Sequence, residues 1–144
     1  MATFKSLQVT NKMPIPSHGA ASSTKVAHFR IDLGATAAAD VIQLGYLPDY
    51  AVPVDVVVHH TAAITGLSVG TAASAAGLMA NAAVAANVPL RTASAPELFK
   101  NVGLGQRLVQ ATVGGTGGSA GTLNVAVSYV VEDQGVGYPF AAAA

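Results

Sequence analysis

The chain has 144 residues and a mass of 14.3 kDa, the usual size of one domain, and is long enough to bury a core without disulfides or metals. Seven basic and seven acidic residues give zero formal net charge, only 10% of residues are charged, and cysteine is absent. With no cluster of cations to meet phosphates, a nucleic-acid partner is not expected. The lack of cysteine excludes disulfides, thiolate nucleophiles and cysteine-ligated metals.

The beginning of the chain does not have the pattern of a signal peptide. Lys5 and Lys12 stand among polar residues, and the apolar stretch of roughly 7–15 residues that such a peptide needs is missing. No stretch of about 20 strongly apolar residues follows, so no membrane partner is expected. The low charge has two explanations that composition leaves open: a surface covered by neighbours in an assembly, or a coding bias towards alanine.

Residues 1–23 combine prolines, a glycine and a run of Ser and Ala with little periodicity. This pattern predicts an extended N-terminal arm with one short strand at about residues 3–10. From Lys25 the pattern changes to strict alternation, which predicts a strand with one buried face. Further strands are predicted at residues 40–47, 52–60, 64–71, 88–93, 106–113 and 122–131. In the last of these, the predicted core face is Leu123, Val125, Val127, Tyr129 and Val131.

Two connections are predicted from composition. Residues 71–87 are rich in alanine and include Leu78 and Met79, which favours a short helical or coiled excursion. Residues 114–121 are rich in glycine and are predicted to form a flexible loop that joins the last two strands as a hairpin.

Short strands separated by turns, without regular alternation of strand and helix, predict an all-β, mainly antiparallel fold. We expect a β-sandwich or jelly roll over residues 24–132 with one short Ala-rich helical excursion. Residues 1–23 form an extended N-terminal arm in this prediction, and residues 133–144 form a C-terminal tail.

No catalytic residues, cofactor or metal site are predicted, and the chain is not expected to be an enzyme. The segment Gly117–Gly121 matches G-x-S-x-G around Ser119, but no histidine follows it and it joins two strands rather than a strand and a helix. His59 and His60 are adjacent on a predicted strand, so they point to opposite faces. Surface or interface histidines are the favoured interpretation, and a metal at an oligomer axis is the alternative.

The tail contains two aromatic residues, Tyr138 and Phe140, on either side of Pro139. A segment this rich in glycine does not fold alone, so the two side chains are either disordered or anchored in a groove of a neighbour. We take them as candidate interaction residues.

Three pieces of the sequence resemble a known family. They are Ala39–Pro48 followed by Val52–Val58, then Leu67–Thr71, and then Val109–Thr116 continuing through Gly121–Leu123 to Val127–Tyr129. These patterns, which span roughly residues 24–132, are similar to those of tailed-bacteriophage virion proteins. The chain most resembles the small head decoration proteins, also called capsid cement proteins.

The resemblance implies a protein that binds the outer surface of an icosahedral head and stabilises it through multivalent contacts between capsomers. It implies the major capsid protein as partner, a homo-oligomer, most often a trimer, synthesis in the host cytoplasm and a place on the capsid surface. Phe4 and Leu7 of the arm would add strand pairing or apolar anchoring to an adjacent sheet.

Two other classes of function are weighed against this one. Another virion component, such as a tail, collar or head-fibre protein, would use the same β architecture. A carbohydrate- or receptor-binding module is also compatible with a jelly roll, because fold alone does not decide function.

Overall fold

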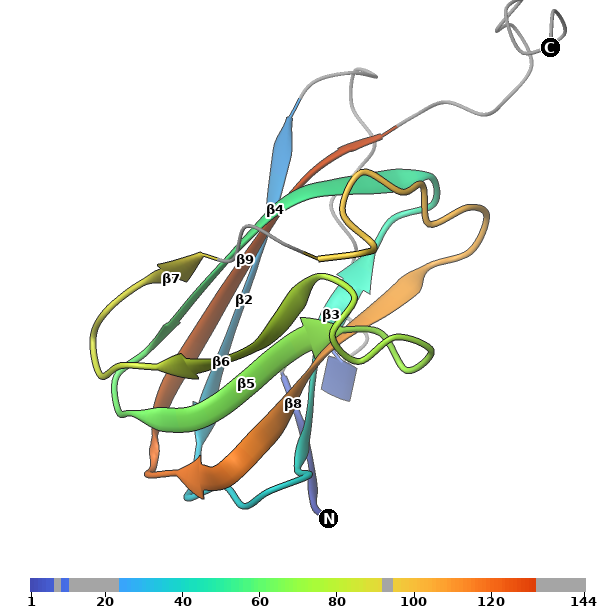
Figure 1. The fold of residues 1–144 in the computed structure, drawn as a ribbon. Helices are drawn as coiled ribbons and strands as arrows, with labels where there is room; N and C mark the ends of the chain where they lie inside the picture. The colour runs from blue at the N-terminus through green and yellow to red at the C-terminus, as the bar shows by residue number, and fades with distance from the viewer. Residues whose placement is uncertain (7–8, 11–23, 92–94, 132–144) are drawn as a thin grey trace, which may run out of the picture.

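The computed structural model describes residues 1–6, 9–10, 24–91 and 95–131 (Figure 1). Within these ranges, α-helical backbone is confined to Val9 and Thr10, and no helix is long and apolar enough to cross a membrane. The remaining regular structure is β, in nine strands: β1 Thr3–Lys5, β2 Lys25–Leu33, β3 Val41–Leu47, β4 Ala51–His60, β5 Ile64–Gly70, β6 Met79–Val84, β7 Leu90–Arg91, β8 Arg107–Gly118 and β9 Gly121–Val131.

The strands form two sheets that lie face to face, which confirms the predicted all-β sandwich (Figure 1). One sheet has the order β1-β3-β8-β5-β6 and the other has the order β2-β9-β4-β7. All pairings are antiparallel except that of β1 with β3, which is parallel.

The chain passes back and forth between the sheets. From β2 to β9, every connection crosses to the other sheet except the one between β5 and β6, which pair directly. An order of β2-β9-β4-β7 over β3-β8-β5-β6 is typical of a jelly roll, in which strands distant in sequence become neighbours. Because of these crossings, the connections collect at the two ends of the sandwich.

Strands β2 and β9 show why these residues form a sheet. Their alternation places every second side chain inside: the buried set of β2 is Ala27, Phe29, Ile31 and Leu33, and that of β9 is Leu123, Val125, Val127, Tyr129 and Val131. The two strands pair along their length, with Phe29 opposite Val125. The β9 set was predicted from the period of two, and the structure confirms it, as it confirms the single buried face predicted for the strand that begins at Lys25.

The predicted helical excursion at residues 71–87 is wrong. Two tight turns follow β5, in which the amides of Ser74 and Gly77 donate to the carbonyls of Thr71 and Ser74, and the chain then enters β6. Met79 and Val84 are buried in β6, and Val69 pairs with Met79. Pairing with β5 and burial of these two side chains outweigh the helix propensity of alanine, which is worth only tenths of a kcal/mol per residue.

The predicted hairpin loop at residues 114–121 is also wrong. Strand β8 continues through the glycines to Gly118, and β9 begins at Gly121, so only Ser119 and Ala120 separate them. The two strands lie in opposite sheets and do not pair. The glycines are needed because the backbones approach closely here: Gly117 has a φ of 94°, and a Cβ on it would overlap the carbonyl oxygen of Thr36.

Replacing this glycine should therefore be costly. We expect Gly117→Ala to lower the free energy of unfolding by about 1–3 kcal/mol, because a side chain at positive φ is strained and Thr36 blocks the added methyl group. The matched control is Gly34→Ala, since no atom lies within 4 Å of a Cβ at Gly34. Equal stability of the two variants in urea unfolding would contradict this account.

Tyr129 is the largest fully buried side chain of the core, and among the described residues its hydroxyl has no hydrogen-bond partner. Burial raises the pKa of this phenol above its ordinary value.

A buried hydroxyl without a partner costs about 1–3 kcal/mol, so we expect Tyr129→Phe to raise the free energy of unfolding by about 1 kcal/mol. Tyr50→Phe, at a partly buried site, should change stability by no more than about 0.5 kcal/mol. A loss of stability in Tyr129→Phe, measured by urea unfolding, would show that the hydroxyl is satisfied.

Candidate functional site

Of the four predicted interaction residues, the structure describes Phe4. It lies in the middle of β1, opposite Ile42 of β3, and its partly buried side chain packs against the protein's own core. Leu7, Tyr138 and Phe140 lie outside the described residues. The structure therefore places Phe4 on the sheet of its own subunit, and its predicted contact with a neighbour's sheet remains a proposal.

Asp40 fastens β1 to the sandwich. Its side chain is only 5% exposed, and its two carboxylate oxygens accept hydrogen bonds from the amides of Ala2 at 2.8 Å and Ala37 at 2.9 Å. Donation by Ala37, and then by Ala2, holds the pKa of Asp40 below its ordinary value of 3.8. The sequence shows Asp40 only as one of several scattered acids, because its partner Ala2 is 38 residues away.

The lowered pKa sets the direction of a pH effect. The charged form of Asp40 is favoured in the folded state, so its contribution to stability is fully present above pH 3.8 and is lost as the pH falls through the lower pKa of the folded protein.

We expect Asp40→Asn to speed amide hydrogen exchange at residues 2–6 near neutral pH, with exchange in β9 unchanged. Unchanged exchange at residues 2–6 would show that the carboxylate does not hold β1.

The histidines do not converge on one point. His60 is fully buried and its Nδ1 lies at hydrogen-bond distance from the carbonyl of Ala62, whereas the neighbouring His59 is partly exposed. His28 lies on β2 beside Asn124, and His18 is outside the described residues. In the ranges that the structure describes, no group of three metal-ligating side chains occurs.

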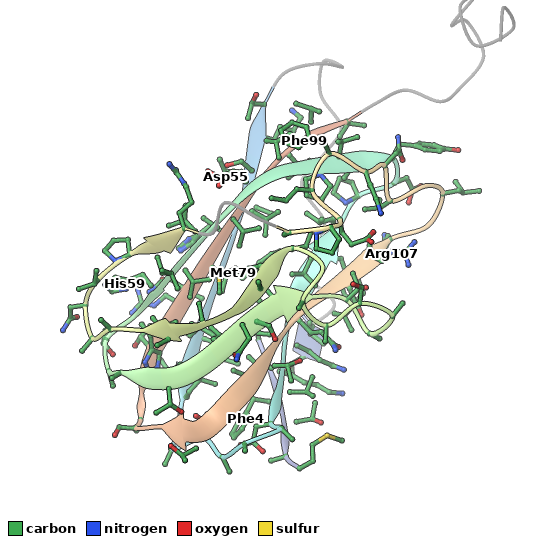
Figure 2. All side chains as sticks on the ribbon, in the orientation of Figure 1. Phe4, Asp55, His59, Met79, Phe99 and Arg107 are labelled. Atoms are coloured by element: carbon green, nitrogen blue, oxygen red, sulfur yellow. The ribbon has the colours of Figure 1, made fainter. Side chains whose placement is uncertain are left out.

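One end of the sandwich carries an exposed apolar surface that the sequence reasoning missed. It belongs to residues 95–106 of the connection between β7 and β8, which we call the 95–106 segment. Phe99 and Leu104 of this segment are 73% and 78% exposed. Figure 2 shows Phe99 and Arg107 towards the end of the sandwich that lies opposite Phe4. The one signal in the sequence is two large apolar residues without periodic partners, set among turn-forming residues such as Asn101, Gly103 and Gly105.

The 95–106 segment is held by backbone hydrogen bonds. The amides of Phe99 and Val102 donate to the carbonyls of Pro53 (2.7 Å) and Ala51 (2.9 Å), so the segment is fastened to the start of β4. On its other side, the amide of Glu97 donates to the carbonyl of Gly77 at 2.8 Å. The exposed side chains are therefore presented by a fixed backbone.

The backbone at this end is also strained. Phe99 has a φ of 63° and Tyr50, whose amide donates to the carbonyl of Gly103, has a φ of 57°. Residues other than glycine in this region cost about 1–3 kcal/mol each, and such strain is concentrated at functional sites. Positive φ values also occur away from this end, at Ala39 and Asn87, so it is the exposure of Phe99 and Leu104 that marks this end as the best candidate for binding.

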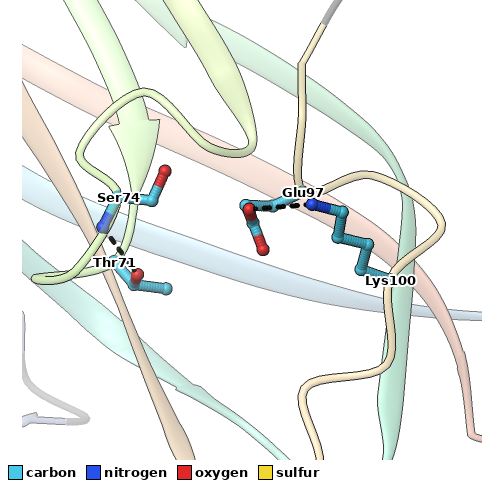
Figure 3. A network of polar contacts seen from close by, with 4 residues as sticks. All are labelled: Thr71, Ser74, Glu97 and Lys100. Carbon is cyan, nitrogen blue, oxygen red and sulfur yellow. Dashed lines mark hydrogen bonds and ion pairs between the residues drawn. The ribbon is translucent and has the colours of Figure 1, made fainter.

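A cleft of about 250 Å³ opens beside the 95–106 segment. The buried part of its lining is Leu47, Pro53 and Leu78, and its charged residues are Glu97, Lys100 and Arg107. Figure 3 shows two of its walls, the Thr71–Ser74 turn and the Glu97–Lys100 pair, whose Oε1 and Nζ atoms are 3.4 Å apart. This arrangement of apolar floor and charged border suits binding of a side chain or small group.

Neither a protein-family model nor a curated protein matches this sequence. Solved structures do match. A chain from the capsid of Ralstonia phage GP4 is similar with a TM-score of 0.78 and 26% identity, and the match covers 92% of this chain and 100% of that one. A chain from the capsid asymmetric unit of cyanophage Pam1 matches with a TM-score of 0.62 and 25% identity, over 83% of this chain and 93% of that one.

Both similar structures are phage capsids. The likeness extends over nearly the whole sandwich in both cases, and it supports a structural role in a phage virion rather than an enzymatic one. The general virion assignment that the sequence resemblance implied is thereby supported. Its finer parts, the decoration role, the trimer and the major capsid protein as partner, remain proposals.

Proposed function

We propose that this protein is a head decoration protein of a tailed bacteriophage, which binds the outer surface of the capsid and stabilises it. The observation that carries the proposal is the match to the chain from the Ralstonia phage GP4 capsid, with its TM-score of 0.78. The match covers 100% of that chain and 92% of this one. That chain is therefore also small, and a single sandwich accounts for all of it. A separate chain of this size within a capsid fits an accessory subunit added to a shell.

The chemistry of the surface supports the same role. Only 10% of residues are charged, so approach to another protein surface strips water from few ionised groups. Phe99 and Leu104 supply large apolar side chains of the kind that act as anchors at the centre of an interface. We propose that the 95–106 segment contacts the major capsid protein and that several copies, as trimers, bridge neighbouring capsomers. Phe4 and Leu7 of the arm add contacts to adjacent subunits.

The test uses phage heads that lack this protein and the full-length chain added back. We expect the chain to co-sediment with heads, and electron cryomicroscopy to show its density on the outer surface. The double variant Phe99→Ala/Leu104→Ala should bind at least tenfold more weakly, since truncation of an anchor costs about 2 kcal/mol. Val26→Ala is the matched control because Val26 is also exposed, at 57%, but lies on β2.

Two outcomes would contradict the proposal. Density confined to the tail or collar would assign the protein to another virion component. Failure to bind any part of the particle, together with binding to a glycan array, would favour the carbohydrate-binding alternative. If Val26→Ala and the double variant weaken binding to heads equally, the decoration role is still supported, but the 95–106 segment is not its docking surface.

A further inference from the structure

The cleft beside the 95–106 segment has the size of a receptor for one aromatic side chain. Its volume of about 250 Å³ is below the roughly 300–1,000 Å³ of pockets that enclose small-molecule ligands. Buried Leu47, Pro53 and Leu78 offer apolar contact. At its border Lys100 is paired with Glu97, and exposed Arg107 adds a positive charge. An occupant with an aromatic ring and nearby acidic groups would complement this surface.

The C-terminal tail leaves the sandwich at the same end. Val131, the last residue of β9, pairs with Ala51 of β4, and the carbonyl of Ala51 accepts the hydrogen bond from Val102 of the 95–106 segment. Figure 1 shows the end of β9 and the 95–106 segment at the same end of the sandwich. Val131 therefore lies two strand-to-strand spacings from Val102, which lines the cleft.

The composition of the tail matches the cleft. Residues 132–144 begin with Glu132 and Asp133, contain no basic residue, and carry the aromatic pair Tyr138 and Phe140. Tyr138 lies seven positions beyond Val131, a distance along the chain that can span up to about 24 Å. Crossing β4 and the backbone of residues 99–102 takes about 10 Å at the usual strand spacing, so the aromatic residues can reach the cleft.

We propose that the Tyr138–Phe140 segment docks into this cleft on its own subunit, with one aromatic ring against Leu47, Pro53 and Leu78. The acidic residues at the start of the tail are attracted by Arg107, since Lys100 is already paired with Glu97. Docking within the subunit is favoured because the tether keeps the tail at an effective concentration in the millimolar range. This proposal stands independently of the decoration function.

The test is hydrogen exchange measured by mass spectrometry on the full-length chain in solution. We expect amides of residues 132–144 to exchange at least tenfold more slowly in the wild type than in the double variant Tyr138→Ala/Phe140→Ala. Blocking the cleft with Ala73→Trp should remove the protection to the same extent, because Ala73 lines the cleft. Ala72→Trp, at the adjacent exposed residue outside the lining, should leave it intact.

Three outcomes would overturn the proposal. The first is tail exchange in the wild type at the rate of an unstructured peptide. The second is protection that survives Ala73→Trp, which would place the aromatic residues elsewhere. The third is protection that disappears on dilution, which would show that the tail binds a second copy. Thermal unfolding of each variant distinguishes loss of docking from loss of fold, and the tail variant tests docking even if Ala73→Trp does not fold.

Discussion

The apolar layer between the two sheets is the interaction on which the rest of the molecule depends. Its members come from both sheets: β2, β4 and β9 on one side, and β3, β5, β6 and β8 on the other. Because side chains alternate along each strand, a slip of one residue in any pairing would turn a buried set of Val, Leu and Ile towards solvent. The layer therefore holds the register of every strand that contributes to it, and with it the positions of the connections.

Electrostatic contacts contribute little to this fold. Two ion pairs occur in the described part of the chain, Arg91 with Asp55 and Lys100 with Glu97, and both involve exposed side chains. Pairs of this kind are worth about 0–1 kcal/mol. Buried polar contacts serve local purposes instead, as where the carboxylate of Asp40 receives two backbone amides and holds β1 against β3.

The crossing topology explains why the proposed binding residues lie at one end of the sandwich. Each passage between sheets needs a connection at an end, and connections on a rigid scaffold are where proteins place binding residues. At one end, Gly117 allows β8 to pass close to Thr36 before the chain turns into β9. At the other, hydrogen bonds to Ala51 and Pro53 fasten the 95–106 segment, which presents Phe99 and Leu104, to the start of β4. The similarity to chains of two phage capsids fits a molecule whose ends make contacts between subunits.

The sequence by itself determined the fold class and most of the strands, because strict alternation in segments such as Lys25–Leu33 has only one side that can be buried. It misjudged residues 71–87 and 114–121, where alanine and glycine carry little information about periodicity and pairing with neighbouring strands of the sheet decided the conformation. Only the tertiary structure brought Ala2 to Asp40, placed β8 and β9 in opposite sheets, and exposed Phe99 beside a cleft. The physical reason is separation along the chain: these contacts join residues tens of positions apart, and local pattern does not record which distant backbone a segment will meet.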